Sequence, residues 1–293
     1  MSLTLARLKE LKRQTGGSPA TATAPPAPSP VPSAHLSIEQ LRQLLRVRAP
    51  QRIAVQQAQD RDVPGRVIAP GLHLVEVLLP DDPLPHAFCG AFDRRDVLDP
   101  STLLFFDTET TGLAGGTGTR AFMIGAADWH GGSLRIRQLT MTTIAAEAAM
   151  LDAFREWLAP DTVLVSYNGK CYDAPLLATR YRLARRSNPM AGLAHVDLLY
   201  PSRRRWRGVY ENCRLATIER QVLRVVREDD LPGAQAPAAW LSYLRGGSAH
   251  MLRRVLAHNH QDVVSLSRLL RRVSGDGFAE SAPLKGAAKS LPQ

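Results

Sequence analysis

Apolar and polar residues follow a regular pattern from residue 103 onward, and this pattern predicts most of the ordered elements. Short apolar or alternating runs that end at turn residues predict five strands, at residues 103–107, 121–129, 134–141, 162–167 and 194–199. Apolar residues at helical spacing predict helices at residues 145–158, 174–185, 214–226 and 249–272. This succession is typical of an α/β fold with one mixed five-stranded sheet and helices on both faces.

The first hundred residues have a different character. Residues 14–35 are rich in Ala, Pro, Thr and Ser, a composition that buries too little apolar surface to order itself. The leucines of residues 1–13 alternate with basic residues, which is typical of a short amphipathic helix for a partner protein or, as we favour, of a frayed solubilising end. Ser37 begins a predicted helix at 37–48, and residues 65–80 suggest strands. The expected domains are a disordered tail at 1–35, an extension with a helix and strands at 36–100, the α/β domain at 101–273 and a disordered tail at 274–293.

The charge balance suggests a partner. Lys and Arg number 37 against 27 Asp and Glu, which gives a net charge of +10 and favours a polyanion such as nucleic acid. The three cysteines form no C-x-x-C pair, which fits a reducing compartment. No apolar run approaches membrane-spanning length, and basic residues interrupt the N-terminal leucines before a signal-peptide core can form. We therefore expect a cytoplasmic protein without a membrane segment.

Two carboxylates stand at the end of the first predicted strand of the α/β domain. Asp107 and Glu109 follow the apolar run at spacing i, i+2, so both side chains project from the same face. Their mutual repulsion requires a compensating positive charge, and a hard divalent cation such as Mg²⁺ or Mn²⁺ prefers oxygen ligands of this kind. The alternative is a strand end whose acids simply face solvent, and for an isolated D-x-E motif that alternative is favoured.

Two further acidic positions follow along the chain. Asp173 begins a predicted helix directly after a strand and a turn, where a carboxylate also serves as an ordinary helix cap. His258 and Asp262 are four residues apart on the last predicted helix and therefore share one face. His260 points away from that face and is expected at the surface.

Taken together, the blocks resemble a known superfamily. D-x-E at Asp107, N-x-x-x-x-D ending at Asp173 and H-x-x-x-D ending at Asp262 occur in the order found in the DEDD (DnaQ-like) 3′→5′ exonucleases, which have a ribonuclease H-like fold. The longer runs LLFFDTETTGLAGGTGT, SYNGKCYDAPLL, HVDLLYPSRRRWR, CRLATIE, DDLPG and HNHQDVVSL resemble the bacterial YprB-type ribonuclease H-like proteins. The resemblance covers about residues 100–273.

The resemblance implies hydrolysis of phosphodiesters by two Mg²⁺ or Mn²⁺ ions. Asp107, Glu109, Asp173 and Asp262 would hold the ions, and His258 would accept the proton of the attacking water. Histidine-type members place five positions between His and Asp, whereas the spacing here is four, that of tyrosine-type members. In the five-position frame the residue is Ala257, which cannot transfer protons, so the base role is given to His258.

Several residues near these blocks are expected to contact the substrate. They are Thr110, Thr111, Gly112, Leu113, Asn168, Lys170, Tyr172, Arg203 and Arg204. Lys170 and Tyr172 could equally be structural, and the arginines between 178 and 227 could form a solvated face. Arginine pairs with phosphates and aromatic rings stack on unpaired bases, so we weigh nucleic-acid contact slightly above that alternative.

The leading hypothesis is a metal-dependent 3′→5′ exonuclease that acts on single-stranded or frayed DNA or RNA. One alternative is a non-catalytic nucleic-acid-binding module on an inherited fold, although such a module gains nothing from acids that face phosphates. Another is a scaffold protein that uses its N-terminal segment to recruit the domain to a complex. The last is compatible with the leading hypothesis.

Overall fold

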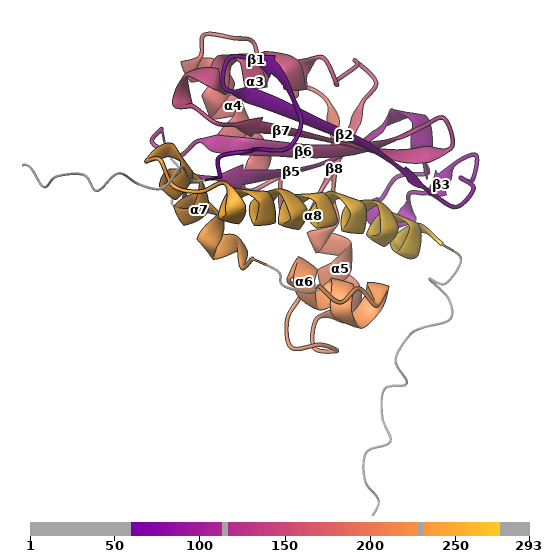
Figure 1. The fold of residues 1–293 in the computed structure, drawn as a ribbon. Helices are drawn as coiled ribbons and strands as arrows, with labels where there is room; N and C mark the ends of the chain where they lie inside the picture. The colour runs from indigo at the N-terminus through magenta and orange to yellow at the C-terminus, as the bar shows by residue number, and fades with distance from the viewer. Residues whose placement is uncertain (1–59, 113–116, 228–230, 276–293) are drawn as a thin grey trace, which may run out of the picture. The chain divides into compact units, whose positions relative to one another are not determined.

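A single mixed sheet organises the part of the chain that the computed structural model describes, residues 60–112, 117–227 and 231–275 (Figure 1). In spatial order its strands are β1 (Arg66–Ala69), β2 (Leu72–Pro80), β7 (Ser133–Met141), β6 (Ala121–His130), β5 (Leu103–Thr110), β8 (Val163–Ser166) and β9 (Ala194–Asp197). β5, β8 and β9 are parallel, and the other neighbours are antiparallel. A small separate pair is formed by β3 (Phe88–Cys89) and β4 (Val97–Leu98).

The mixed sheet predicted from the sequence is confirmed, and it has seven strands rather than five. The additional strands come from the expected strand region before residue 81. β2 pairs with β7 along its whole length, from Leu72 opposite Met141 to Pro80 opposite Ser133. Pro70 falls in the turn between β1 and β2, and Pro80 ends β2, so neither proline removes a hydrogen bond from the middle of the ladder.

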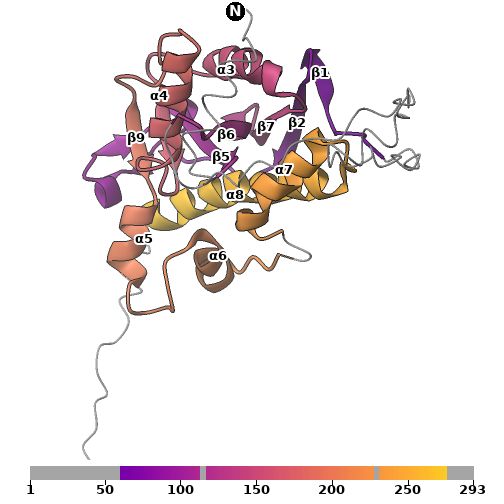
Figure 2. The same cartoon turned by 90° about the vertical axis from the view of Figure 1, so that its left-hand side faces the viewer.

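Helices cover both faces of the sheet, as predicted. α3 (Glu147–Arg155) and α4 (Asp173–Leu183) lie over one face, whereas α7 (Ala236–Leu244) and the long α8 (His250–Ser274) cross the other (Figures 1 and 2). The remaining helices are α5 (Leu199–Trp206) and α6 (Leu215–Ile218). Short 3₁₀ turns occur at Ala91–Asp93, Pro100–Thr102, Ile144–Ala146 and Gly233–Gln235. No helix among the described residues is long and apolar enough to span a membrane.

Two helical regions differ from the sequence prediction. The helix expected at 214–226 is only α6, followed by a π-helical turn, Glu219–Leu223, that ends at Arg224 with φ 57°. α5 and α7 were not predicted. Each carries a proline in its first turn, where the missing N–H has no intrahelical partner and the residue is tolerated.

The interior explains why β5 is so apolar at its start. Leu104 and Phe106 join one buried cluster, and Leu103 and Phe105 join a second cluster on the other side. A strand buried on both faces reads as a continuous apolar run. β5 therefore forms a rigid base for the polar residues at its carboxyl end.

Several sequence expectations lie outside the described residues. They are the N-terminal tail, its amphipathic segment, the helix at 37–48, Leu113 and residues 276–293 of the expected C-terminal tail, whose first residue, Ser274, instead ends α8.

Candidate functional site

The four acids singled out by the sequence converge at the carboxyl end of β5. Asp107 and Glu109 stand on β5, Asp173 is the first residue of α4, and Asp262 lies in the middle of α8. The pKa of Asp107 is raised well above its usual value, first by burial and then by the charges of Asp262, Asp173 and Glu109. The charges of three carboxylates, from β5, α4 and α8, therefore act on Asp107.

A cation-sized cluster forms on the α8 side of this point. Ligand atoms of Glu109, His258 and Asp262 all lie within 4.8 Å of one another. His258 Nε2 is 3.5 Å from Asp262 Oδ2, as the four-residue helical spacing requires. Burial also raises the pKa of the Asp262 carboxyl. Because carboxylate oxygens held together at this cost are the donors that Mg²⁺ and Mn²⁺ prefer, the donor set fits a divalent ion.

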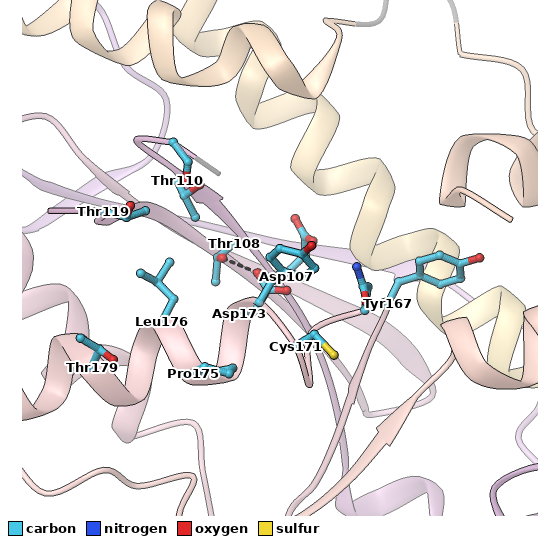
Figure 3. A pocket seen from close by; sticks show the side chains of 13 residues that line it. Asp107, Thr108, Thr110, Thr119, Tyr167, Cys171, Asp173, Pro175, Leu176 and Thr179 are labelled. Carbon is cyan, nitrogen blue, oxygen red and sulfur yellow. Dashed lines mark hydrogen bonds between the residues drawn. The ribbon is translucent and has the colours of Figure 1, made fainter. Parts of the chain in front are cut away.

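Asp173 faces the same point from the opposite side of β5 (Figure 3). The Thr108 hydroxyl donates a hydrogen bond to Asp173 Oδ1. Burial raises the pKa of Asp173 to about 6, although the bond from Thr108 opposes this shift. The contact fixes the carboxylate of α4 against the strand that carries Asp107.

A buried amide relay orients Asp107, and the sequence analysis missed it. Asn259 Nδ2 donates to Asp107 Oδ2 over 3.0 Å, and Asn259 Oδ1 accepts from Gln138 Nε2 over 2.9 Å. A Cβ at Gly125 would lie 2.0 Å from Asn259 Oδ1, so glycine is required on the facing strand β6. A signal for Asn259 was present in the sequence. This polar residue stands four positions before the apolar Val263 on the predicted helix and therefore on its buried face.

The loop that delivers Asp173 is held by a fifth acid, Asp197. This carboxylate is fully buried and accepts backbone N–H groups of Asn168 at 2.7 Å, Lys170 at 3.1 Å and Leu199 at 3.0 Å. Asn168 has φ 67°, a left-handed conformation that asparagine tolerates better than most residues. Asp197 therefore shapes the turn, and its charge adds to the causes that raise the pKa of Asp173.

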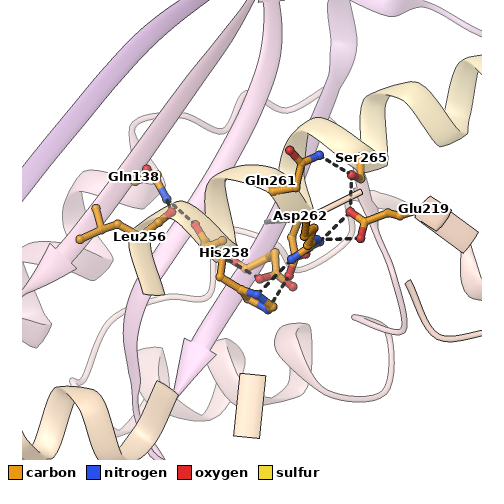
Figure 4. Close-up of polar contacts among 10 residues, drawn as sticks. Gln138, Glu219, Leu256, His258, Gln261, Asp262 and Ser265 are labelled. Carbon is orange, nitrogen blue, oxygen red and sulfur yellow. Dashed lines mark hydrogen bonds and ion pairs between the residues drawn. The ribbon is translucent and has the colours of Figure 1, made fainter. Parts of the chain in front are cut away.

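Arg227, one of the arginines for which nucleic-acid contact was weighed slightly above a solvated face, lies inside the site. Arg227 donates to both carboxylate oxygens of Glu219, at 2.8 and 2.6 Å, to Asp262 Oδ1 and to His258 Nδ1, the last at 3.0 Å. Glu219 is 1% exposed and also accepts a hydrogen bond from the Ser265 hydroxyl. Figure 4 shows Glu219, Asp262 and His258 arranged around these contacts.

A groove of about 580 Å³ opens beside Asp107 and Asp173. Of the residues expected to contact substrate, it is lined by Thr110, Gly112, Asn168 and Tyr172. Lining residues that the sequence analysis did not single out are Thr108, Thr119, Tyr167, Cys171, Pro175, Leu176 and Thr179.

Thr111, Lys170, Arg203 and Arg204, which were also expected to contact the substrate, do not line this groove. The Thr111 hydroxyl accepts the Arg120 N–H at 3.0 Å, which closes the neck of the loop between β5 and β6. Lys170 is exposed and does not line the groove. Arg203 and Arg204 are exposed on α5, and Arg204 donates to the Phe92 carbonyl, so part of its role is structural.

Comparison with known proteins places this site in a family. The model of the RNase_H superfamily matches residues 104–274, more than half of the chain, and includes all four acids. The chain belongs to the RNase H superfamily. Within this family, the uncharacterized protein YprB of Bacillus subtilis (strain 168) is 35% identical over 182 residues, which cover 62% of this chain and 44% of YprB. This chain thus spans less than half the length of that relative.

Solved structures show more distant likenesses. The family B DNA polymerase of Pyrobaculum calidifontis superposes with a TM-score of 0.46 at 16% identity, over 60% of this chain and 26% of the polymerase. E. coli exonuclease I in complex with a dT13 oligonucleotide superposes with a TM-score of 0.35 at 15% identity, over 54% of this chain and 43% of the exonuclease. At these TM-scores the likenesses do not bear on activity.

Proposed function

We propose that this chain is a metal-dependent phosphodiesterase that removes nucleotides from the 3′ end of single-stranded or frayed DNA or RNA. The observation that carries the proposal is the convergence of Asp107, Glu109, Asp173 and Asp262 at the end of β5, beside an open groove. Membership of the RNase H superfamily supports a nuclease. The net charge of +10 supports nucleic acid as the substrate.

The arrangement suggests how the residues divide the work. Asp107 lies between the other acids and would contact both of two divalent ions, with Glu109 and Asp262 on one side and Asp173 on the other. Such ions, when bound, lower the pKa of a water nucleophile and stabilise the leaving oxygen. Asn259 and Thr108 hold Asp107 and Asp173 in place, so these two carboxylates need little reorganisation when ions bind.

His258 is the proposed base, because its ring lies beside Asp262 at the edge of the acid cluster. A guanidinium only donates, so Nδ1 accepts the hydrogen bond from Arg227, and a neutral ring then carries its proton on Nε2. Nε2 can take a proton from water only when the ring proton stands on Nδ1 instead, and this requires that the contact with Arg227 open.

Hydrolysis of 5′-labelled single-stranded oligonucleotides tests the proposal and ranks DNA against RNA. With Mg²⁺ or Mn²⁺ we expect a ladder that shortens from the 3′ end, and with EDTA no ladder. Asp107→Asn protein, purified in parallel, is the control for contaminating nucleases. Strand binding without cleavage by the wild type in the presence of bound metal would instead favour a non-catalytic binding module.

A further inference from the structure

Arg227 connects a buried anchor to two residues of the acid cluster. Its guanidinium is fixed by two hydrogen bonds to Glu219, whose side chain is 1% exposed, while the Arg227 side chain is 11% exposed. From this anchor it reaches Asp262 Oδ1 and His258 Nδ1. The Glu219 carboxylate accepts hydrogen bonds from Arg227 and from the Ser265 hydroxyl.

The contacts of Arg227 use the atoms that a metal ion needs. One oxygen of Asp262 accepts from the guanidinium, and the other faces His258 Nε2 at 3.5 Å. A divalent ion that shares Asp262 with Glu109 must take one of these oxygens. It would then stand beside a fixed positive charge in a poorly solvated site, where like charges repel strongly. Occupation of Asp262 by the guanidinium and by the ion is therefore competitive.

The same guanidinium gives two buried carboxylates a positive partner in the absence of metal. Buried carboxylates require a positive partner, and the planar guanidinium can satisfy two carboxylates at once. Glu219 and Asp262 are bridged in this way on either side of Arg227.

We propose that Arg227 is a positioning residue that serves as an internal counter-cation: it holds Asp262 and His258 in the metal-free protein and is displaced from both when a divalent ion binds. This inference rests on the proposed function. Displacement releases an oxygen of Asp262 to the ion and frees Nδ1 of His258 in the same step. Arg227 thus sets the ion concentration at which the site fills.

Mn²⁺ affinity, measured on the full chain by electron paramagnetic resonance of free Mn²⁺, tests the inference without reference to activity. The test variant is Arg227→Gln with Glu219→Gln, which removes the guanidinium together with the charge of its buried anchor. Its matched control is Arg220→Gln with Glu211→Gln, because that pair lies in the same region with side chains 55% and 50% exposed. Both double variants keep the net charge of the wild type.

We expect the test variant to bind Mn²⁺ about tenfold more tightly than the wild type, the effect of releasing one charge-assisted hydrogen bond, and the control to bind as the wild type does. Unchanged or weaker binding by the test variant would overturn the inference while leaving the proposed function standing. Unchanged or weaker Mn²⁺ binding is the result expected if Arg227 instead binds a phosphate of the substrate. If neither wild type nor test variant binds Mn²⁺ at millimolar concentration, the proposed function falls as well.

A second variant covers the case in which the double variant does not fold. Arg227→Lys keeps the charge but presents a single ammonium, which cannot bridge Glu219 and Asp262 as a planar fork does. We expect it to bind Mn²⁺ more tightly than the wild type and less tightly than the double variant. Affinity equal to or weaker than that of the wild type in folded Arg227→Lys protein contradicts the inference.

Discussion

At the scale of single residues, the acid cluster costs the metal-free protein stability. The pKa values of Asp107, Asp173 and Asp262 are all raised, with burial as the largest cause. The folded protein therefore holds protons that the unfolded chain has already released. The contribution of these three groups to stability is greatest below the unfolded pKa of about 4, and it declines as pH rises through the raised values, because the folded state binds more protons than the unfolded chain in that range.

Asp107→Asn is expected to stabilise the metal-free protein at pH 7.5. The amide removes a charge from the cluster, and its oxygen can still accept the hydrogen bond from Asn259. A gain of about 1–2 kcal/mol corresponds to a rise in Tm of about 5 °C for a domain of this size. At pH 4 the wild-type carboxyl is largely protonated in the fold, so the difference should vanish.

Thermal melts in EDTA at the two pH values measure this effect, and melts with Mn²⁺ provide the second half of the test. Mn²⁺ should raise the Tm of the wild type and leave that of Asp107→Asn almost unchanged. An Asp107→Asn protein that is less stable than the wild type at pH 7.5 would mean that the cluster carries no electrostatic cost.

At the scale of elements, the positions of Asp107 and Asp173 depend on the strand and the loop that carry them. β5 delivers Asp107 because its first half is buried on both faces, and α4 begins at Asp173 because the preceding loop is fixed on Asp197. The Asp197 carboxylate accepts three backbone N–H groups. The geometry of Asp173 is therefore set by a residue at the end of the neighbouring strand, β9.

Asp197→Asn is expected to lower the rate of phosphodiester hydrolysis even where the variant is fully folded. The amide retains one acceptor oxygen and places an NH₂ group against backbone donors, so a buried N–H is left without its partner. The cost is about 2 kcal/mol in unfolding free energy. Displacement of Asp173 should lower turnover at least tenfold at a temperature where the variant is fully folded, by analogy with other small misplacements of catalytic groups.

Urea denaturation and initial rates, compared with Asp161→Asn, separate the two effects. Asp161 is exposed just before β8 and should tolerate the amide in both measurements. If Asp197→Asn loses stability but keeps the wild-type rate, the carboxylate supports the fold without positioning Asp173.

Local patterns identified the strands and the acids, because strand period and helical spacing determine which side chains share a face. Asp107 with Glu109, and His258 with Asp262, are such cases. Arg227 could not be identified in this way, because its partners Glu219 and Asp262 are brought to it by a π-helical turn and by packing against α8. Asp197 was missed for a similar reason, since two of the three N–H groups that donate to it belong to the backbone of another loop.

At the scale of the whole molecule, the sheet extends beyond the part matched by the family. β1 and β2 precede residue 104 and nevertheless pair with the sheet, where Leu72 is fully buried. Nine residues of β2 cover the outer edge of β7. The segment before the family match therefore contributes to the stability of the described fold.

Two truncations test this division of the chain. Deletion of residues 1–35 should leave the Tm and the rate of hydrolysis unchanged, whereas deletion of residues 1–80 should lower the Tm by more than 10 °C or abolish folding, because it uncovers β7 and its apolar neighbours. Melting curves and initial rates of the two proteins measure this. A 1–80 deletion that melts like the wild type would show that β1 and β2 contribute little to stability.

The central claim is that the four acids at the end of β5 form a metal-dependent phosphodiesterase. The most direct measurement is release of a labelled 3′-terminal nucleotide from a single-stranded oligonucleotide in one turnover, with Mn²⁺ and with EDTA, by wild type and Asp107→Asn. We predict that the wild type releases a mononucleotide in Mn²⁺, and that neither the wild type in EDTA nor Asp107→Asn in Mn²⁺ does so. Equal release by Asp107→Asn, or none by wild-type protein that has bound both Mn²⁺ and the strand, would contradict the claim.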